Sequence, residues 1–236
     1  MSKLAIVFQP LHILNTSPGF AERFLPVVQE NGYVPLVLDT SVACEYEIQD
    51  IHRIIEFWID RYPQIYESSL VVGNALGGVV AHALSSKLNR EARIITVSAP
   101  SKVTPELYLK FTKVIERTIS DGSSSGMNML EEYINTADIS SVHSNLPEAQ
   151  ACKRIMYGLK AIANYECPCS CTQRSNLAIV GLDSRLSQAD NICTCDNPSI
   201  LEVPHAGMRP HIDNPEVVFK AVNKFLKGFF YEAQMS

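Results

Sequence analysis

Gly73-Asn74-Ala75-Leu76-Gly77-Gly78 is the stretch of sequence that decides the fold. It follows the apolar run Leu70–Val72 and leads into a run with helical character, Val79–Leu88. Small residues between an apolar run and a helical pattern predict a strand that ends in a sharp turn and passes directly into a helix. We expect this strand, turn and helix to form the centre of the molecule.

Apolar runs and helical patterns alternate on both sides of this stretch. Further short apolar runs, typical of strands that are buried on both faces, occur at 4–8, 33–38, 93–97, 176–182 and 200–203. Helical spacing of the apolar residues occurs at 20–29, 48–59 and 215–230. Alternation of this kind predicts the α/β class, with a mostly parallel sheet and helices on both of its faces.

The alternation is interrupted between residues 101 and 175, where helical patterns occur and no strand is expected. Residues 121–126 are expected to form a polar Gly/Ser linker within this segment. We therefore expect a core built from residues 1–100 and 176–236, with residues 101–175 forming a helical cap, or lid, over the carboxyl ends of the strands. Open α/β sheets bind ligands at that edge, so the cap is expected to enclose a mostly apolar pocket.

Composition narrows the class of protein. The 236 residues are 46% hydrophobic and 19% charged, a balance that allows one α/β domain with a sizeable core. The net charge is −5 and no cluster of lysine or arginine stands out, so we expect no nucleic-acid partner and no anionic membrane surface. No apolar run approaches the roughly 18 residues that a transmembrane helix needs. The first apolar run, 4–8, is too short for the core of a signal peptide, so we expect a cytoplasmic protein.

Five of the seven cysteines fall in two clusters, Cys167/Cys169/Cys171 and Cys193/Cys195. The odd total and the lack of a signal peptide argue against a secreted disulfide framework. Zinc sites usually use two to four residues between paired cysteines, whereas these clusters have one. We expect free thiols in loops, with a disulfide between the clusters or a metal site as alternatives, and we expect no resident metal and no cofactor.

Three motifs in chain order resemble the α/β-hydrolase superfamily, in particular its small cap-bearing esterase, lyase and ring-cleavage-product hydrolase branches. The run LVVGNALGGVV at 70–80 is similar to the nucleophile elbow of that superfamily, G-x-S-x-G. The run LAIVGLD at 177–183 looks like the strand that ends in the triad acid. The run VPHAGMRPHIDNPE at 203–216 looks like the segment that carries the triad histidine. The resemblance covers nearly the whole chain and implies the α/β-hydrolase fold.

Matching the triad residue by residue shows that its chemistry is altered. The serine position is Ala75, the histidine position is Met208, and the acid position keeps Asp183. An alanine methyl cannot attack a carbonyl, and a thioether cannot act as a base at neutral pH. A serine–histidine acyl-enzyme mechanism is therefore excluded unless His205 or His211 takes over with water as the nucleophile. Asp183 could act as the acid of the triad, or it could be a loop residue that makes only a structural hydrogen bond.

The resemblance also implies an oxyanion hole, a pair of backbone N–H donors that stabilise negative charge on a substrate oxygen. Its donors would be the N–H groups of Leu11 and Leu76, which do not depend on side-chain identity. The loop after the first strand usually carries His-Gly in this superfamily, and here it reads Gln9-Pro10. In the same loop, His12 either faces the cleft or plays a structural role.

Four more side chains are candidates around the cleft. Gln9 and Asn74 could each orient a carbonyl group, or tie down a turn. His205 is expected either to line the pocket as an acid, base or hydrogen-bonding group, or to pack at the end of a strand. His211 is expected to lie where the chain turns towards the surface, which leaves it a structural role.

Three separate departures at one site, at Ala75, Met208 and Gln9-Pro10, indicate drift or repurposing rather than a single engineered change. The first hypothesis is an enzyme that performs a cyclisation, rearrangement or elimination on a small, largely apolar molecule, within a biosynthetic pathway. The second is a non-catalytic binder of a small hydrophobic ligand, a pseudoenzyme. The third is a serine esterase or thioesterase present as an inactive variant, or a hydrolase with relocated residues. An apolar cap helix could also serve as the face of a homodimer.

Overall fold

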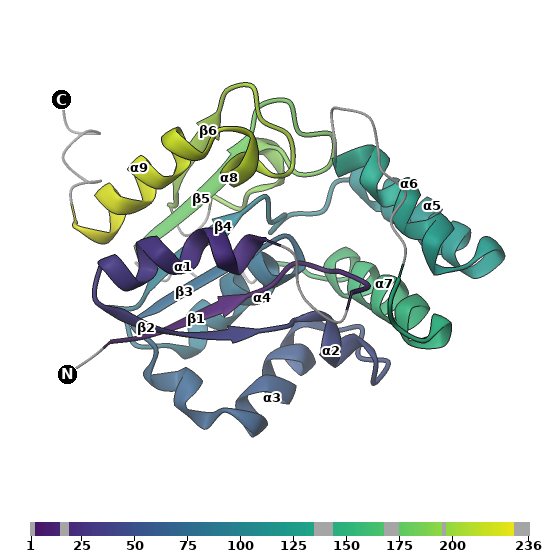
Figure 1. Cartoon of the computed structure of the whole chain (residues 1–236), viewed down its shortest axis with the longest axis horizontal. Coiled ribbons are helices and arrows are strands. Elements are labelled where there is room, and N and C mark those ends of the chain that lie inside the picture. Colours follow the sequence, from purple (N-terminus) through teal and green to yellow (C-terminus); the bar gives the residue numbers. More distant parts are fainter. Residues whose placement is uncertain (1–2, 15–18, 135–143, 168–174, 195–196, 229–236) are drawn as a thin grey trace.

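Six parallel strands form one sheet in the order β2-β1-β3-β4-β5-β6 (Figure 1). The computed structural model describes residues 3–14, 19–134, 144–167, 175–194 and 197–228. Each expected strand is present within two residues of its expected ends. The strands are β1 (Lys3–Phe8), β2 (Tyr33–Leu38), β3 (Leu70–Asn74), β4 (Arg93–Val97), β5 (Asn176–Gly181) and β6 (Ser199–Val203).

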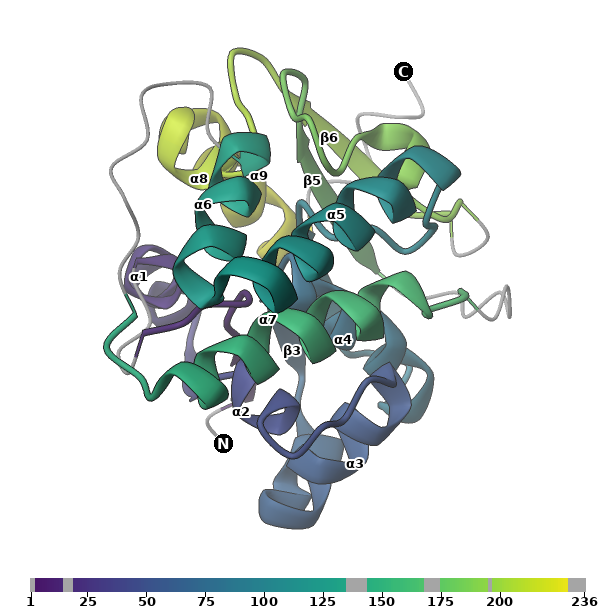
Figure 2. The same cartoon turned by 90° about the vertical axis from the view of Figure 1, so that its right-hand side faces the viewer.

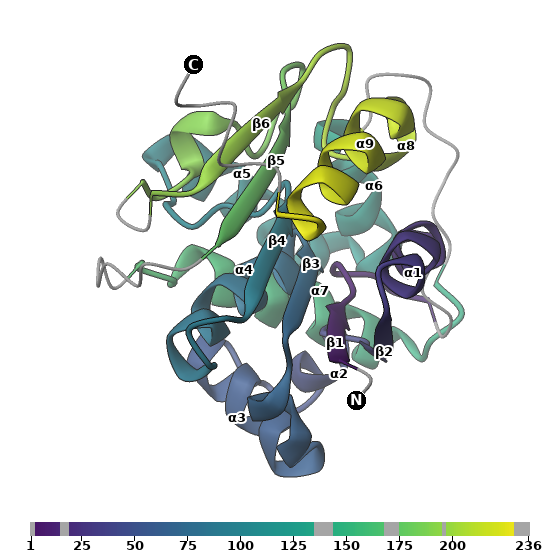
Figure 3. The same cartoon turned by 90° about the vertical axis from the view of Figure 1, so that its left-hand side faces the viewer.

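Helices cover both faces of the sheet, as the alternation predicts. Helices α1 (Phe20–Glu30) and α9 (Pro215–Leu226) pack on one face, and α3 (Ile51–Arg61) and α4 (Leu76–Leu84) pack on the other (Figures 1 and 3). Successive strand residues point to opposite faces, so the central strand β3 contributes to both layers and is buried throughout. Two-sided burial explains why the inner strands β1, β3, β4 and β5 are continuous apolar runs, whereas the edge strands β2 and β6 are partly exposed.

Two short helices were not predicted from the sequence. They are α2 (Ser41–Cys44) and α8 (Pro210–Asp213), each of four residues. A helix of one turn is too short to show the periodic spacing of apolar residues on which the prediction depends. No helix among the described residues is long and apolar enough to cross a membrane.

Three helices lie beyond the carboxyl ends of the strands: α5 (Pro105–Asp121), α6 (Ser123–Ile134) and α7 (Glu148–Ala163) (Figures 1 and 2). As expected, the described residues between β4 and β5 contain no strand. Helix α5 packs against both α6 and α7, and Figure 2 shows the three together in front of the sheet edge.

The expected linker at 121–126 is wrong, because α6 begins at Ser123. Gly122 has φ +88° and supplies a single-residue break between two helices. The backbone N–H and the hydroxyl of Ser123 donate to the carboxylate of Glu148, at 2.6 and 2.7 Å, which satisfies the start of α6. Gly126 allows α6 to approach α5, since a Cβ there would lie 1.9 Å from Thr118 Oγ1. Small residues serve close helix packing here rather than flexibility.

The turn between β3 and α4 is held by close backbone contacts. Ala75 has φ +48° and ψ −116°, a strained conformation for a residue with a side chain. A Cβ on Gly73 would lie 2.2 Å from the carbonyl oxygen of Gly77, and a Cβ on Gly77 would lie 2.5 Å from the carbonyl oxygens of Phe8 and Gln9. The first turn of α4 therefore rests directly on the backbone that leaves β1.

Replacing Gly77 tests this contact. Gly77→Ala should lower the free energy of unfolding by about 3 kcal/mol, because backbone atoms cannot move aside for the new methyl group. Gly158→Ala, in helix α7, is the matched control, since its Cβ would meet the end of the flexible Leu11 side chain at 2.4 Å. The control should lose less than about 1 kcal/mol, as a side chain can rotate. Equal losses in urea unfolding would contradict the backbone contact.

Candidate active site

A cavity of about 350 Å³ lies between the carboxyl edge of the sheet and the helices α5–α7. Its wall is mostly apolar and includes Leu107, Phe111, Leu130 and Leu159 from those helices. The opposite side is formed by the loop after β1, the turn before α4, the end of β4 and the segment after β6. Its volume and composition suit a small organic molecule.

The turn before α4 and the loop after β1 each place one potential backbone donor in the wall of this cavity. Ala75, Leu76 and Leu11 all line it. Within the described chain, the backbone N–H groups of Leu11 and Leu76 make no hydrogen bond. Two unpaired backbone donors on one cavity wall are chemically suited to bind an oxygen atom of a ligand, including one that gains negative charge.

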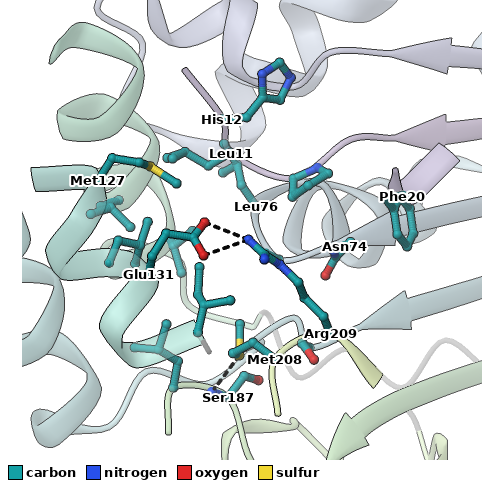
Figure 4. A pocket seen from close by; sticks show the side chains of 18 of the residues that line it. Leu11, His12, Phe20, Asn74, Leu76, Met127, Glu131, Ser187, Met208 and Arg209 are labelled. Atoms are coloured by element: carbon teal, nitrogen blue, oxygen red, sulfur yellow. Dashed lines mark hydrogen bonds and ion pairs between the residues drawn. The ribbon is translucent and has the colours of Figure 1, made fainter. Parts of the chain in front are cut away.

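Two more sequence candidates line the cavity and one does not. Met208 lies in its wall, where its sulfur accepts a hydrogen bond from the Ser187 N–H at 3.4 Å (Figure 4). Asn74 also lines it, and its buried Oδ1 has no hydrogen-bond partner among the described residues. Gln9 is buried but does not contribute to the cavity wall.

Asp183 and His205 lie outside the cavity. Asp183 is exposed and lines a separate polar hollow, and its N–H donates to the carbonyl oxygen of Ala206 at 2.9 Å. His205 is exposed on the turn that follows β6, at φ +55°. The hypothesis that His205 lines the pocket is therefore wrong, because the turn directs its side chain to the surface. In this structure neither residue can act directly on a ligand in the cavity.

His12 lines the cavity, but its ring is held by the protein. Its Nε2 lies 3.0 Å from Asp39 Oδ1, an ion-pair contact rather than a hydrogen bond. Its Nδ1 accepts weakly from the Leu14 N–H at 3.4 Å. Burial alone would raise the pKa of Asp39, but the contacts with His12 and Arg154 outweigh it and hold that pKa below its usual value. The structural role proposed for His12 therefore fits these contacts.

Arg154, on helix α7, fastens that helix to the same loop. Its Nη1 donates to Asp39 Oδ2 at 3.1 Å and to the carbonyl oxygen of Leu14 at 3.3 Å, and its Nε donates to Glu45 Oε1 at 2.7 Å. The guanidinium is almost completely buried. Helix α7 thus positions the loop that carries Leu11, the first of the two backbone donors.

Removing this guanidinium tests its contribution. Arg154→Met should lower the free energy of unfolding by about 3 kcal/mol, since two partly buried carboxylates lose their partner. Lys153→Met is a matched control on the same helix, where Lys153 makes an exposed ion pair with Glu47 at 2.8 Å. The control should change stability by less than about 0.5 kcal/mol, as exposed pairs contribute little. Similar urea midpoints for both variants would contradict this role of Arg154.

His211 lines the cavity as well, which corrects its expected place at the surface. Helix α8 turns the chain inward, so the His211 ring is only 1% exposed and packs edge-on against Phe20 at 5.1 Å. Its Nδ1 has no hydrogen-bond partner in the described part of the chain. Burial, together with the positive charges of Arg209 and Arg23, lowers the pKa of His211 to about 4, so the ring is neutral at pH 7.

This lowered pKa predicts a pH dependence of stability. Below the ordinary pKa of 6.5, the unfolded chain takes up a proton at His211, whereas the folded chain does not until the pH approaches 4. Stability is therefore fully present above pH 6.5 and falls as the pH falls towards 4, by roughly 3 kcal/mol.

His211→Phe keeps the ring volume and removes the titrating group, so its unfolding free energy should depend less steeply on pH over this range. The difference between wild type and variant, measured in urea at several pH values, cancels the contributions of all other groups. Parallel curves for the two proteins would contradict a neutral, buried His211.

An ion pair within the cavity wall joins the segment after β6 to helix α6. Arg209, in the segment after β6, donates from Nη2 to both carboxylate oxygens of Glu131 on α6, at 2.6 and 2.9 Å (Figure 4). Glu131 is buried, and the pair links α6 to the sheet. Sequence reasoning missed this pair because nothing local relates two residues 78 positions apart.

One described cysteine of each cluster lies outside this cavity. Cys167 and Cys193 line a second, more open hollow between α5 and the end of α7. Cys169, Cys171 and Cys195 lie outside the described residues. Among the residues that are described, no three His, Cys, Asp or Glu side chains are grouped so that they could hold a metal ion.

Solved structures of similar shape identify the fold, although no family model and no curated protein matches the sequence. An esterase from Exiguobacterium antarcticum superposes with a TM-score of 0.68 at 13% identity, over 96% of this chain and 92% of that one. A thermophilic esterase from Thermogutta terrifontis gives 0.63 at 15% identity, over 96% and 90%. MenH from S. aureus gives 0.65 at 13% identity, over 97% and 94%. The chain has the α/β-hydrolase fold.

Proposed function

We propose that this protein is an enzyme of the α/β-hydrolase fold that has been repurposed for non-hydrolytic chemistry on a small, largely apolar molecule. The reaction would be a cyclisation, rearrangement or elimination, of the kind that biosynthetic pathways use. One observation carries the proposal. Ala75 and Met208, at the positions that resemble those of the triad serine and histidine, both line the cavity and offer neither a nucleophile nor a base.

The backbone at Ala75 supports continued use of the site. A non-glycine residue in so strained a conformation costs about 1–3 kcal/mol. The strained residue stands directly before α4, whose first residue, Leu76, lines the cavity. A turn that keeps a strained alanine after losing its nucleophile is consistent with a function for the backbone donor itself.

Positioning can supply the remaining catalysis. An enclosed apolar cavity can hold a flexible molecule in one reactive shape, and in well-oriented cases such positioning lowers a barrier by about 7–11 kcal/mol. The unpaired N–H groups of Leu11 and Leu76 could polarise a carbonyl group without any covalent step. Neither contribution requires serine or histidine at the triad positions.

Under this proposal the helices α5–α7 act as a cap that closes the site, within the segment 101–175. Helix α5 also exposes Tyr108, Leu109 and Ile119, each more than half exposed, which would suit a homodimer face on the cap. The partner inside the cavity would be a small hydrophobic molecule, and we propose a cytoplasmic location.

Two other functions remain as alternatives. The esterase structures that share this fold favour a serine hydrolase in inactive form. The absence of a nucleophile at Ala75 equally favours a pseudoenzyme that binds its ligand without changing it.

Isotope labelling separates the three functions. The ligand that copurifies with the protein is identified by native mass spectrometry and incubated with the protein in ¹⁸O-labelled water. The proposal expects a product without ¹⁸O, because no water is added. A product that contains ¹⁸O would indicate hydrolysis, and an unchanged ligand would indicate a binder.

The double substitution Ala75→Ser with Met208→His provides the control. It restores a nucleophile and a base beside the same backbone donors, so it should hydrolyse p-nitrophenyl acetate faster than wild type and faster than either single variant. Failure to do so would argue that Leu11 and Leu76 do not form an oxyanion hole.

A further inference from the structure

Apart from His12 Nε2, which lies 3.0 Å from Asp39 Oδ1, four buried polar atoms of residues that line the cavity have no hydrogen-bond partner among the described residues. They are Asn74 Oδ1, Ser98 Oγ, Ser187 Oγ and His211 Nδ1. An unpaired polar atom in a protein interior is uncommon, because losing its hydrogen bonds to water is costly. Four such atoms around one cavity indicate that its ligand supplies the missing partners.

The cavity also contains charged and titratable groups whose bonds are already made within the protein. Glu131 and Arg209 bind each other, and the His12 ring lies between Asp39 and the Leu14 N–H. His211 differs from them, because its ring is neutral and the described residues leave its Nδ1 without a partner, whereas His12 Nε2 keeps its contact with Asp39. The polar groups of the cavity that lack a partner among the described residues are therefore uncharged.

The types of these groups define the ligand. The backbone N–H groups of Leu11 and Leu76 can only donate, so they require an acceptor such as a carbonyl oxygen. Hydroxyl groups such as those of Ser98 and Ser187, and a neutral imidazole such as that of His211, can pair with a hydroxyl group. A hydrocarbon would leave all of them unpaired.

We infer that the cavity selects an uncharged hydroxy-carbonyl compound, with an apolar body, a carbonyl oxygen bound by the backbone donors and a hydroxyl group bound by His211 and the buried serines. This inference rests on the proposed function, whose ligand it specifies. It concerns binding selectivity, and its test therefore does not depend on turnover.

A matched series of probes tests the inference by isothermal titration calorimetry. Benzoin carries a carbonyl and a neighbouring hydroxyl group between two phenyl rings, deoxybenzoin lacks the hydroxyl group, and bibenzyl lacks both. Benzoin should bind about three- to tenfold more tightly than deoxybenzoin, and deoxybenzoin more tightly than bibenzyl, since each lost hydrogen bond leaves cavity atoms unpaired.

Two variants assign the selectivity to named groups. His211→Phe and Ser98→Ala should each reduce the preference for benzoin over deoxybenzoin, while the affinity for bibenzyl stays the same or rises. Ser68→Ala is the matched control, because Ser68 is also a buried serine whose hydroxyl has no partner among the described residues, yet it does not line the cavity. It should leave the preference unchanged.

Stability separates a ligand-binding role from a structural one. Ser98→Ala removes a hydroxyl group that the described protein does not satisfy, so the urea midpoint of the free protein should not fall. A lower midpoint would indicate that Ser98 supports the fold.

Wild-type protein that binds benzoin no more tightly than bibenzyl, or that binds none of the probes, would overturn the inference. The proposed function would survive that result if the copurifying ligand, of whatever class, is converted without uptake of ¹⁸O.

Discussion

The contact between the first turn of α4 and the backbone leaving β1 is the constraint on which the rest of the structure depends. It exists because Gly73 and Gly77 lack side chains that would collide with backbone carbonyl groups. Beside this contact Ala75 adopts a strained turn conformation, and Leu76, which follows it with an unpaired backbone N–H, lines the cavity. The loop that carries the other donor is positioned from outside by Arg154. The site therefore depends on backbone geometry more than on any single catalytic side chain.

The sequence predicts the sheet well because its inner strands are buried on both faces and so appear as unbroken apolar runs. Prediction from the sequence fails where one residue type can serve more than one structural role. Glycine and serine at 121–126 suggested a linker, but Gly126 is needed for close helix packing. The site was predicted in part: Asn74, Ala75 and Met208 follow from motifs, whereas His211 and the Arg209–Glu131 pair depend on contacts between distant segments. Two prolines, Pro210 and Pro215, were the local signal that the chain near His211 forms a helical turn.

The cavity wall carries two kinds of polar group, one from the backbone and one from side chains. Its donors at Leu11 and Leu76 belong to the backbone and survive any substitution that leaves the turn intact. Its remaining groups belong to side chains at the end of β3, directly after β4, on α8 and in the segment between β5 and β6, and they can change one at a time. The chemistry of such a site is therefore easier to alter than its geometry, which is consistent with an inherited fold and a changed reaction.

The ion pair between Arg209 and Glu131 has a consequence for the electrostatics of the site. The two charges neutralise each other within the wall, and the only other titratable side chains that the described cavity offers, His12 and His211, are a ring in contact with a carboxylate and a neutral imidazole. An ionised molecule that entered would lose its hydration shell without gaining a free counter-charge. The cavity therefore offers an ion no free counter-charge among its described side chains. A carboxylate, the usual product of ester cleavage, would have to be held by the backbone N–H groups of Leu11 and Leu76 alone.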